Sequence, residues 1–380
     1  MTLVNAGEQL LSANRFHDEA EHSWTLPARW YTDPGIFALE KENILFCNWW
    51  YAGAEAAVSD PSSYLTTTIV DQDVLVIRGA DGILRGFYNV CRHRAHRLVS
   101  GKGCRHRIIC PYHGWTYEND GRFVIGRGVD RIAGFDRQAA GLVPIRVDTM
   151  LGLVFVNLDA EARPLEQMAK GMLADMRAHC PNLDTLVLAH HYERETAANW
   201  KTLVDNDLES YHSATGHAAL MDLLDYESFK VWEYEFATCH SMANTNPDNS
   251  AYEIAEGAAV KTAIYTWLWP NTAFFIAPGK SNLAVFQMAP TGPETSLQVW
   301  DFYFEDQNLD ESEQAYVDYT IETLIPEDSA LYENVQRGLR SRGYGEGRFV
   351  INYDRPEWSE HHVHLFQKLV RDAVTSGRHV

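Results

Sequence analysis

Residues 91–115, CRHRAHRLVSGKGCRHRIICPYHGW, hold three cysteines, four histidines and six basic residues, and they contain no carboxylate. Within this segment Cys91 is followed by His93, and after sixteen further residues Cys110 is followed by His113. Two thiolates suit one ferric ion and two imidazoles suit a second, which is the mixed ligation of one type of 2Fe-2S cluster. The spacing therefore predicts an iron–sulfur cluster bound by two cysteines and two histidines.

A second pair in the segment, Cys104 and His106, repeats the letters of Cys91 and His93. Only three residues separate His106 from Cys110, too few for two independent loops to approach a cluster from opposite sides. A longer loop with a Gly-Lys-Gly turn separates His93 from Cys110. We therefore expect the cluster ligands to be Cys91, His93, Cys110 and His113.

Two other interpretations fit the same letters. A run of buried thiols and solvated histidines would need no metal, and two cysteines with two histidines could bind structural zinc. The zinc interpretation lacks the usual closely spaced pair of cysteines.

The segment, with its CPYHGW end, resembles the Rieske domain of the non-haem iron oxygenases. The resemblance implies that the four predicted ligands bind a Rieske 2Fe-2S cluster, and that His96, Cys104 and His106 are loop or surface residues. Nearby cations would favour the reduced cluster and could dock an acidic ferredoxin-like donor. A solvated charged face is the plainer interpretation of several of these cations, which are Arg92, Arg94, Arg97, Lys102, Arg105 and Arg107.

Residues 199–222, NWKTLVDNDLESYHSATGHAALMD, carry a second group with possible chemistry. A helix predicted over residues 201–213 would place Glu209 and His212 on one face. His217 would lie about 140° away on an unbroken helix, but Gly216 interrupts it and lets His217 turn back toward His212. The two histidines are then a plausible pair of iron ligands; the plainer alternative is two exposed histidines near a helix end.

A third iron ligand must come from elsewhere, because an oxygen-activating ferrous site typically uses two histidines and one carboxylate. In LIPEDSALYENVQRGLRSR, Pro326 marks a helix start. Asp328 falls within the apolar stripe of this helix, Glu327 lies at its edge and Glu333 points away. A carboxylate on a buried face needs a partner, and a metal supplies one. We expect Asp328 to be the ligand, with Glu327 as the alternative; the stripe is Leu331, Val335 and Leu339.

The NWK motif, the carboxylate before His-x4-His and the late Glu-Asp pair resemble the catalytic domain of Rieske oxygenase α subunits, over nearly the whole chain. The resemblance implies that His212, His217 and Asp328 bind a mononuclear Fe2+ that reacts with dioxygen. It implies that Glu209 bridges two metal centres, bonded to His212 of its own chain and to His113 of a neighbouring subunit in a homotrimer. Electrons would come from an NAD(P)H-dependent flavin or ferredoxin reductase.

The bridging carboxylate is Asp in many of these proteins, and the longer Glu209 resembles the branch that acts on quaternary ammonium compounds such as glycine betaine, carnitine and stachydrine. The tail, RSRGYGEGRFV followed by EHHVHLFQKLV, also resembles this branch. His361, His362 and His364 suggest a metal site there. The helical spacing of Val363, Phe366 and Val370 instead favours an ordinary packed helix.

Aromatic residues alternate in IYTWLWPNTAFFIAPG, where Tyr265, Trp267 and Trp269 could form part of a cage for a cation, although such a row is more often core. Asp205 and Asp207 would suit a cationic substrate if either faces the pocket. We therefore expect hydroxylation or N-demethylation of a small quaternary ammonium compound. The alternatives are an aromatic-ring hydroxylase of the same fold and a non-catalytic Rieske electron carrier, which the intact iron ligands disfavour.

The 380 residues must form the elements that position these groups. Short strands with turn signals run from residue 64 to residue 158, and helical and longer β patterns follow. We expect an α+β protein: residues 1–40 packing on the catalytic domain, an all-β Rieske domain over 41–160, and a catalytic domain over 161–380 with an antiparallel sheet surrounded by helices, of the helix-grip type. A net charge of -20 disfavours nucleic acid, and no apolar run predicts a membrane span. The amino terminus shows no export signal, which predicts a cytoplasmic protein.

Overall fold

The computed structural model describes residues 10–244, 246, 248–254 and 257–376. The chain divides into two compact units, one of residues 46–165 and one of residues 1–45 together with 166–380. The first unit, residues 46–165, thus begins and ends about five residues later than the domain over residues 41–160 that the sequence suggested. Among the described residues, no helix is both long and apolar enough to cross a membrane.

The unit of residues 46–165 consists of two antiparallel sheets. The larger sheet has seven strands in the order β1-β10-β9-β4-β3-β2-β5, and the smaller has the order β6-β7-β8. Apolar residues of both sheets share one core, which holds the cysteine–histidine loops. The strands are β1 (Trp50–Ala54), β2 (Ser63–Ile69), β3 (Gln72–Arg78), β4 (Leu84–Tyr88), β5 (Lys102–Cys104), β6 (Ile108–Ile109), β7 (Thr116–Tyr117), β8 (Phe123–Ile125), β9 (Pro144–Met150) and β10 (Leu153–Asn157). The predicted all-β domain is confirmed.

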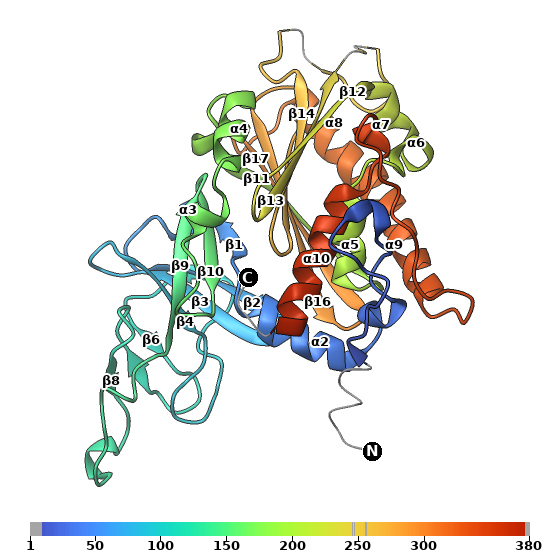
Figure 1. Cartoon of the computed structure of the whole chain (residues 1–380). Helices are drawn as coiled ribbons and strands as arrows, with labels where there is room; N and C mark the ends of the chain where they lie inside the picture. Colours follow the sequence, from blue (N-terminus) through green and yellow to red (C-terminus); the bar gives the residue numbers. More distant parts are fainter. Residues whose placement is uncertain (1–9, 245, 247, 255–256, 377–380) are drawn as a thin grey trace, which may run out of the picture. The chain divides into compact units, whose positions relative to one another are not determined.

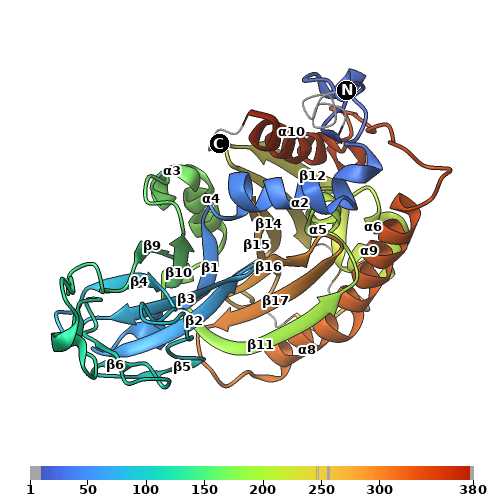
Figure 2. The same cartoon turned by 90° about the horizontal axis from the view of Figure 1, so that it is seen from below.

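The second unit is built on a seven-stranded antiparallel sheet in the order β11-β17-β16-β15-β14-β13-β12. Helices α5, α9 and α10 cover one face of this sheet (Figures 1 and 2). The strands are β11 (Val187–Thr196), β12 (Leu224–Glu233), β13 (Ala237–Asn244), β14 (Thr262–Leu268), β15 (Thr272–Ile276), β16 (Asn282–Gly292) and β17 (Thr295–Phe304). The helices are α2 (Pro34–Glu40), α3 (Leu165–Met168), α4 (Met172–His179), α5 (Trp200–Asp207), α6 (Ser213–Gly216), α7 (Ala218–Leu223), α8 (Glu311–Tyr319), α9 (Ile325–Leu339) and α10 (His361–Ser376). The expected helix-covered antiparallel sheet is confirmed.

Helix α5 is anchored by a buried ion pair to α2. Lys201 Nζ lies 2.5 Å from Glu40 Oε1, and both side chains are 0% exposed. Trp200 Nε1 donates to the other carboxylate oxygen of Glu40 at 3.0 Å. Asn199 caps the helix by accepting from the Lys201 N–H. The NWK motif therefore fixes the start of α5 against the N-terminal segment.

Helix α5 ends earlier than the sequence suggested. The predicted helix over residues 201–213 is wrong, because α5 stops at Asp207 and α6 begins only at Ser213. The last turn of α5 holds Asp205 and Asp207 and no basic residue that would stabilise the negative end of the helix dipole. The Glu209–His212 segment is consequently a turn rather than a helix face.

Helix α9 begins near Pro326, as predicted, but a different face is buried. Ile325, Ser329, Tyr332 and Gln336 are buried, whereas Val335 is 50% exposed. The predicted core stripe of Leu331, Val335 and Leu339 instead lines a surface cavity. Gln336 is directed inward because its side chain bonds the backbone N–H of Asn199 at 2.9 Å.

Replacing Glu40 with Gln should leave the Lys201 ammonium buried without a counter-charge. We expect a loss of about 3–5 kcal/mol in the free energy of unfolding, measured by urea unfolding with tryptophan fluorescence. The control is Asp184→Asn, which breaks the half-exposed pair with Arg177 and should cost no more than about 1 kcal/mol. Equal costs for the two variants would show that the buried pair does not anchor the fold.

Candidate metal centres

The two cysteine–histidine pairs lie on two similar loops of the first unit. The Cys91 N–H donates to the His96 carbonyl at 2.8 Å, and the Cys110 N–H donates to the Trp115 carbonyl at 2.8 Å. Each loop therefore folds back on the backbone of its cysteine. Gly114 has φ +70°, a conformation that favours glycine, and closes the second loop.

The loops bury their cysteines and expose their histidines. Cys91 and Cys110 are 3% and 2% exposed, while the exposed rings of His93 and His113 lie 4.7 Å apart between centroids. Burial raises the pKa of the Cys110 thiol, and the neighbouring Cys91 sulfur raises it further. Thiolates can form there only with a compensating positive charge, which iron ions supply. The donor set therefore fits a cluster with thiolates on one iron and imidazoles on the other.

Two aromatic residues support this arrangement. The Tyr117 hydroxyl lies 3.3 Å from Cys91 Sγ and accepts from the Arg92 N–H at 3.0 Å. The Trp115 ring stacks on His93 at 4.9 Å with an interplanar angle of 10°. Sequence reasoning missed Tyr117, because its contact with Cys91 depends on the pairing of β6 with β7.

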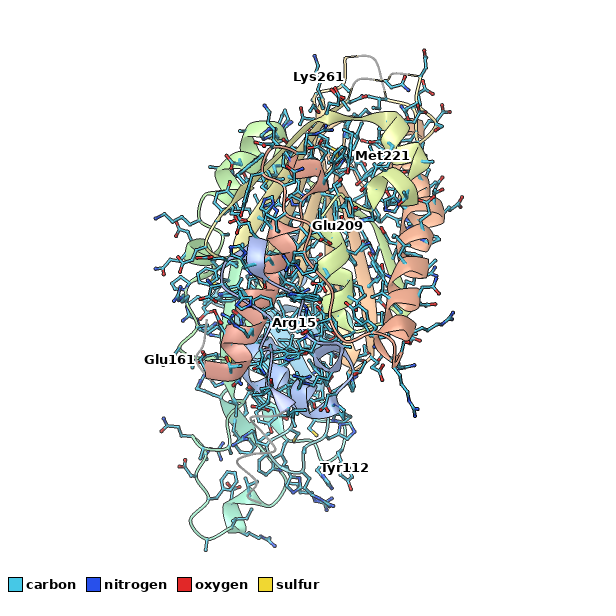
Figure 3. All side chains as sticks on the ribbon, turned by 45° about the vertical axis from the view of Figure 1, so that its right-hand side comes forward. Arg15, Tyr112, Glu161, Glu209, Met221 and Lys261 are labelled. Carbon is cyan, nitrogen blue, oxygen red and sulfur yellow. The ribbon has the colours of Figure 1, made fainter. Side chains whose placement is uncertain are left out.

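The repeated pair lies away from these loops. Cys104 is exposed on β5, and His106 Nδ1 lies 3.3 Å from the Ser62 hydroxyl. Two of the six basic residues of segment 91–115 form ion pairs with carboxylates outside it, Arg97 with Asp73 and Arg107 with Glu118. Tyr112, labelled in Figure 3, is an exposed aromatic residue whose ring contacts that of His113.

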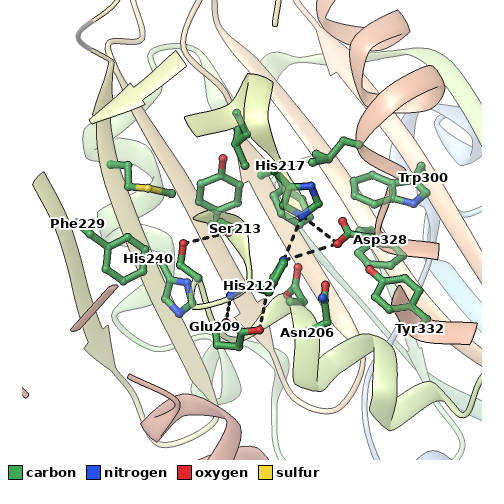
Figure 4. Close-up of a pocket in the computed structure, with 18 residues that line it drawn as sticks. Asn206, Glu209, His212, Ser213, His217, Phe229, His240, Trp300, Asp328 and Tyr332 are labelled. Atoms are coloured by element: carbon green, nitrogen blue, oxygen red, sulfur yellow. Dashed lines mark hydrogen bonds and ion pairs between the residues drawn. The ribbon is translucent and has the colours of Figure 1, made fainter. Parts of the chain in front are cut away.

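In the second unit His212, His217 and Asp328 point toward one another (Figure 4). The Nε2 atoms of the two histidines lie 3.1 Å apart. Asp328 Oδ1 lies 3.0 Å from His217 Nε2 and 3.7 Å from His212 Nε2. One ligand atom from each residue thus converges on a single point.

The outer nitrogens of both rings are held by carboxylates. His212 Nδ1 donates to Glu209 Oε1 at 2.5 Å, and His217 Nδ1 donates to Glu327 Oε2 at 2.8 Å. With their protons on Nδ1, both neutral rings direct lone pairs toward Asp328 Oδ1, which then has no hydrogen-bond donor. A cation between these three atoms would satisfy them all. This donor set, two imidazoles and one carboxylate, fits ferrous iron.

The protein can place a proton there when no metal is bound. Burial lowers the pKa of His217, but the hydrogen bond and charge of Asp328, followed by those of Glu327, raise it to about 9. Glu327, the alternative third ligand in the sequence, contacts the outer nitrogen of His217, a position that suits a residue that orients the ring.

A pocket opens beside these residues and is walled by six aromatic side chains. The Phe286 and Trp300 rings stack at 4.1 Å, and Tyr265 contacts Phe275 edge-on at 5.2 Å. Asp207 also lines the pocket, and burial followed by the charge of Asp328 raises its pKa to about 8. The six aromatic residues are Phe229, Tyr265, Phe275, Phe286, Trp300 and Tyr332.

Three predicted pocket residues lie elsewhere. Trp267 and Trp269 are buried and pack against Phe366 of α10 at 5.6 and 6.0 Å, so the expectation that they contact substrate is wrong. Asp205 does not line this pocket, because its carboxylate is held by the Tyr31 hydroxyl and Gln367.

Five of the six aromatic wall residues were missed in the sequence. Phe275 lies opposite Tyr265 in the β14–β15 hairpin, so period-two alternation could have identified it. Phe229, Phe286, Trp300 and Tyr332 come from three further strands and one helix, and no local pattern connects them.

The fold defines an oxygenase with a Rieske domain and a catalytic domain that carries a candidate His/Asp metal site. The family model "Rieske [2Fe-2S] domain" matches residues 48–136, and "Ring hydroxylating alpha subunit (catalytic domain)" matches residues 183–376. The chain belongs to the Rieske non-haem iron oxygenases, as a catalytic α subunit of the ring-hydroxylating family.

Its relatives include the oxygenase subunit of carnitine monooxygenase from Escherichia coli K12, 33% identical over 97% of this chain and 98% of that protein. The chloroplastic choline monooxygenase of Spinacia oleracea is 28% identical over 91% and 78%. The crystal structure of a quaternary ammonium Rieske monooxygenase with L-carnitine has a TM-score of 0.85 at 33% identity, covering 94% of this chain and 97% of that one. A naphthalene 1,2-dioxygenase from Rhodococcus shares only the fold, at 19% identity over 93% and 94% with a TM-score of 0.78.

The cluster ligands can be tested by electron paramagnetic resonance of the reduced protein. Cys91→Ala or His113→Cys should abolish the rhombic, low-average-g signal of a Rieske centre, because each removes one of four ligands. Cys104→Ala should leave the signal intact. Loss of the cluster in Cys104→Ala would refute the ligand set.

Asp328→Ala should remove the mononuclear iron and substrate oxidation while the Rieske absorption persists, because one of three protein ligands is lost. Glu327→Gln should retain iron with an affinity lowered about 10–100-fold, as expected for a residue that orients a ligand. Metal analysis of the desalted proteins measures both. Full iron content in Asp328→Ala would reassign the third ligand.

Proposed function

We propose that this oxygenase hydroxylates or N-demethylates a small quaternary ammonium compound, with electrons from an NAD(P)H-dependent flavin or ferredoxin reductase. The pocket beside the mononuclear centre carries the proposal. Its described lining combines six aromatic residues with Asp207 and includes no lysine or arginine. Aromatic faces attract quaternary ammonium groups strongly once water is excluded. The names of the carnitine and choline relatives are consistent with this substrate class.

When bound, the mononuclear iron would supply oxygen activation and the Rieske cluster would supply single electrons. His212, His217 and Asp328 are the residues that would hold the iron, and Glu209 and Glu327 keep both rings oriented. The aromatic wall would place an N-methyl group near this centre while excluding water. A bound cation would lower the raised pKa of Asp207, and the carboxylate so formed would offset the charge of the cation.

Glu209 is our proposed route for electrons between subunits. Both of its carboxylate oxygens accept from His212, one from the ring and one from the backbone N–H at 3.0 Å. Glu209 also borders a cavity of about 290 Å³ whose wall includes Leu331, Val335 and Leu339. These partly exposed apolar residues could pack against a neighbouring subunit whose His113 would then reach Glu209. Such a head-to-tail contact closes as a ring, most simply a homotrimer.

The function is tested by a substrate screen with a compatible reductase, scoring formaldehyde and oxygen consumption together. Quaternary ammonium compounds should yield formaldehyde or a hydroxylated amine, whereas neutral analogues with a tert-butyl group in place of the trimethylammonium group should bind at least about tenfold more weakly. A phenol or cis-diol from an aromatic substrate would support ring hydroxylation instead, which the same aromatic wall could accommodate.

Glu209→Gln should preserve folding and both metals but slow their electron exchange by orders of magnitude, because one of the two accepting oxygens is replaced by an NH2 donor. Single-turnover reoxidation of the pre-reduced cluster, with substrate and oxygen present, measures the effect. Reduction of the cluster by its donor serves as the internal control and should be unchanged. Wild-type reoxidation, or full activity in a monomeric protein, would defeat the proposal.

A further inference from the structure

A second group of two histidines and one carboxylate lies in the same unit as the mononuclear centre. Glu233 ends β12, and His361 and His362 begin α10. One ligand atom from each lies within 4.8 Å of the other two. In the described part of the chain, only this trio and the iron ligands converge in this way. The packed helix predicted here is confirmed, but it leaves these residues unexplained.

His362 is the residue that most needs a partner. It is 1% exposed, its Nδ1 lies 2.6 Å from His240 Nε2, and its own Nε2 has no hydrogen-bond partner. Burying an unpaired polar atom is costly. The nearest carboxylate oxygen, Glu233 Oε1, is 3.5 Å from this nitrogen.

That separation is too long for a good hydrogen bond, which spans about 2.7–3.2 Å. It is close to the roughly 3.4 Å between two ligands of a tetrahedral zinc ion with bonds of about 2.0–2.1 Å. The mononuclear centre of the same chain shows comparable separations between ligand atoms, from 3.0 to 3.7 Å. The Glu233–His362 pair is therefore spaced for a shared metal rather than for direct contact, and the ligand atom of His361 lies within 4.8 Å of both.

The outer nitrogens are also arranged as they are at the iron ligands. His361 Nδ1 lies 3.0 Å from the Ser359 hydroxyl, and His362 Nδ1 is held by His240. Both Nε2 atoms are left for the centre of the trio. Hydrogen bonds to the outer nitrogen are the usual way in which proteins orient a histidine that binds a metal.

The charges around the trio also favour a cation. No lysine or arginine in the described chain forms an ion pair with Glu233, so its carboxylate is left for another cation. The Glu233 side chain is 44% exposed, which provides a path for entry.

We propose that Glu233, His361 and His362 bind a divalent transition-metal ion, best matched by zinc. The ion joins the first turn of α10 to the end of β12. It also fixes His362 as a donor through Nδ1, so that His240 accepts at Nε2 and carries its own proton on Nδ1. Because His240 lines the substrate pocket, the ion sets the tautomer that a substrate meets.

The test uses the full-length protein with the cluster retained and the iron site removed by the double substitution His217→Ala and Asp328→Ala. After treatment with a chelator, equilibrium dialysis against Zn2+ and metal analysis should find one zinc per chain. Adding Glu233→Gln or His361→Gln should abolish this stoichiometric binding. Adding His364→Gln should not, because His364 lies in the same turn of α10 but bonds the His17 carbonyl.

The cluster signal and circular dichroism confirm that each variant is folded. Absence of zinc from the double variant, or equal binding after Glu233→Gln, would overturn the site. So would a third result: no metal in any variant, but slower turnover and an altered solvent isotope effect when Glu233→Gln is introduced alone, with His217 and Asp328 intact. That result would make Glu233, His362 and His240 a proton path from solvent to the pocket.

Discussion

The buried ion pair of Lys201 and Glu40 is the constraint on which the catalytic unit depends. An ammonium and a carboxylate that are both inaccessible to water tolerate only one relative position, so α2 and α5 are held in fixed register. Gln336 of α9 bonds the start of α5, and Gln367 of α10 bonds Asp205 in its last turn. These contacts link α5 to α2, α9 and α10, which are distant in the sequence, and so fix the positions of the ends of α5 and α9. The turn that carries Glu209 and His212, and the first turn of α9 that carries Asp328, follow directly from them.

The described residues around the iron site include several acids and no lysine or arginine. Glu209, Glu327 and Asp328 surround two imidazoles, and Asp207 adds a fourth acid whose ionisation is suppressed by burial. No described lysine or arginine lines the pocket. The carboxylates would therefore be neutralised by cations bound from solution. On our proposal these are the metal ion and then the substrate. The overall charge of -20 makes the approach of both favourable.

The closeness of each pair of expected ligands was predictable because each pair lies within a short segment whose spacing reflects local geometry, whereas Asp328 comes from a distant helix. Cys91 with His93, and Cys110 with His113, each share one tight loop, and His212 with His217 share one turn. The end of α5, the buried face of α9 and the pocket walls were not predictable, because contacts between remote segments decide them. Val335 is exposed although its helical spacing suggests a core position, since Gln336 bonds Asn199 and sets the rotation of the helix. Trp267 and Trp269 looked available for a ligand, but Phe366 of α10 covers them.

The two metal centres differ in how tightly their ligands are enclosed. Both cysteines of the cluster loops are 2–3% exposed, although His93 and His113 are exposed. At the mononuclear site His217 is buried, but the His212 side chain is 20% exposed and lies outside regular helix. We expect the mononuclear iron to exchange with the medium during purification and the cluster to persist. A preparation can then be brown and correctly folded yet inactive. Its specific activity would report the supply of ferrous iron in the buffer as much as the quality of the protein.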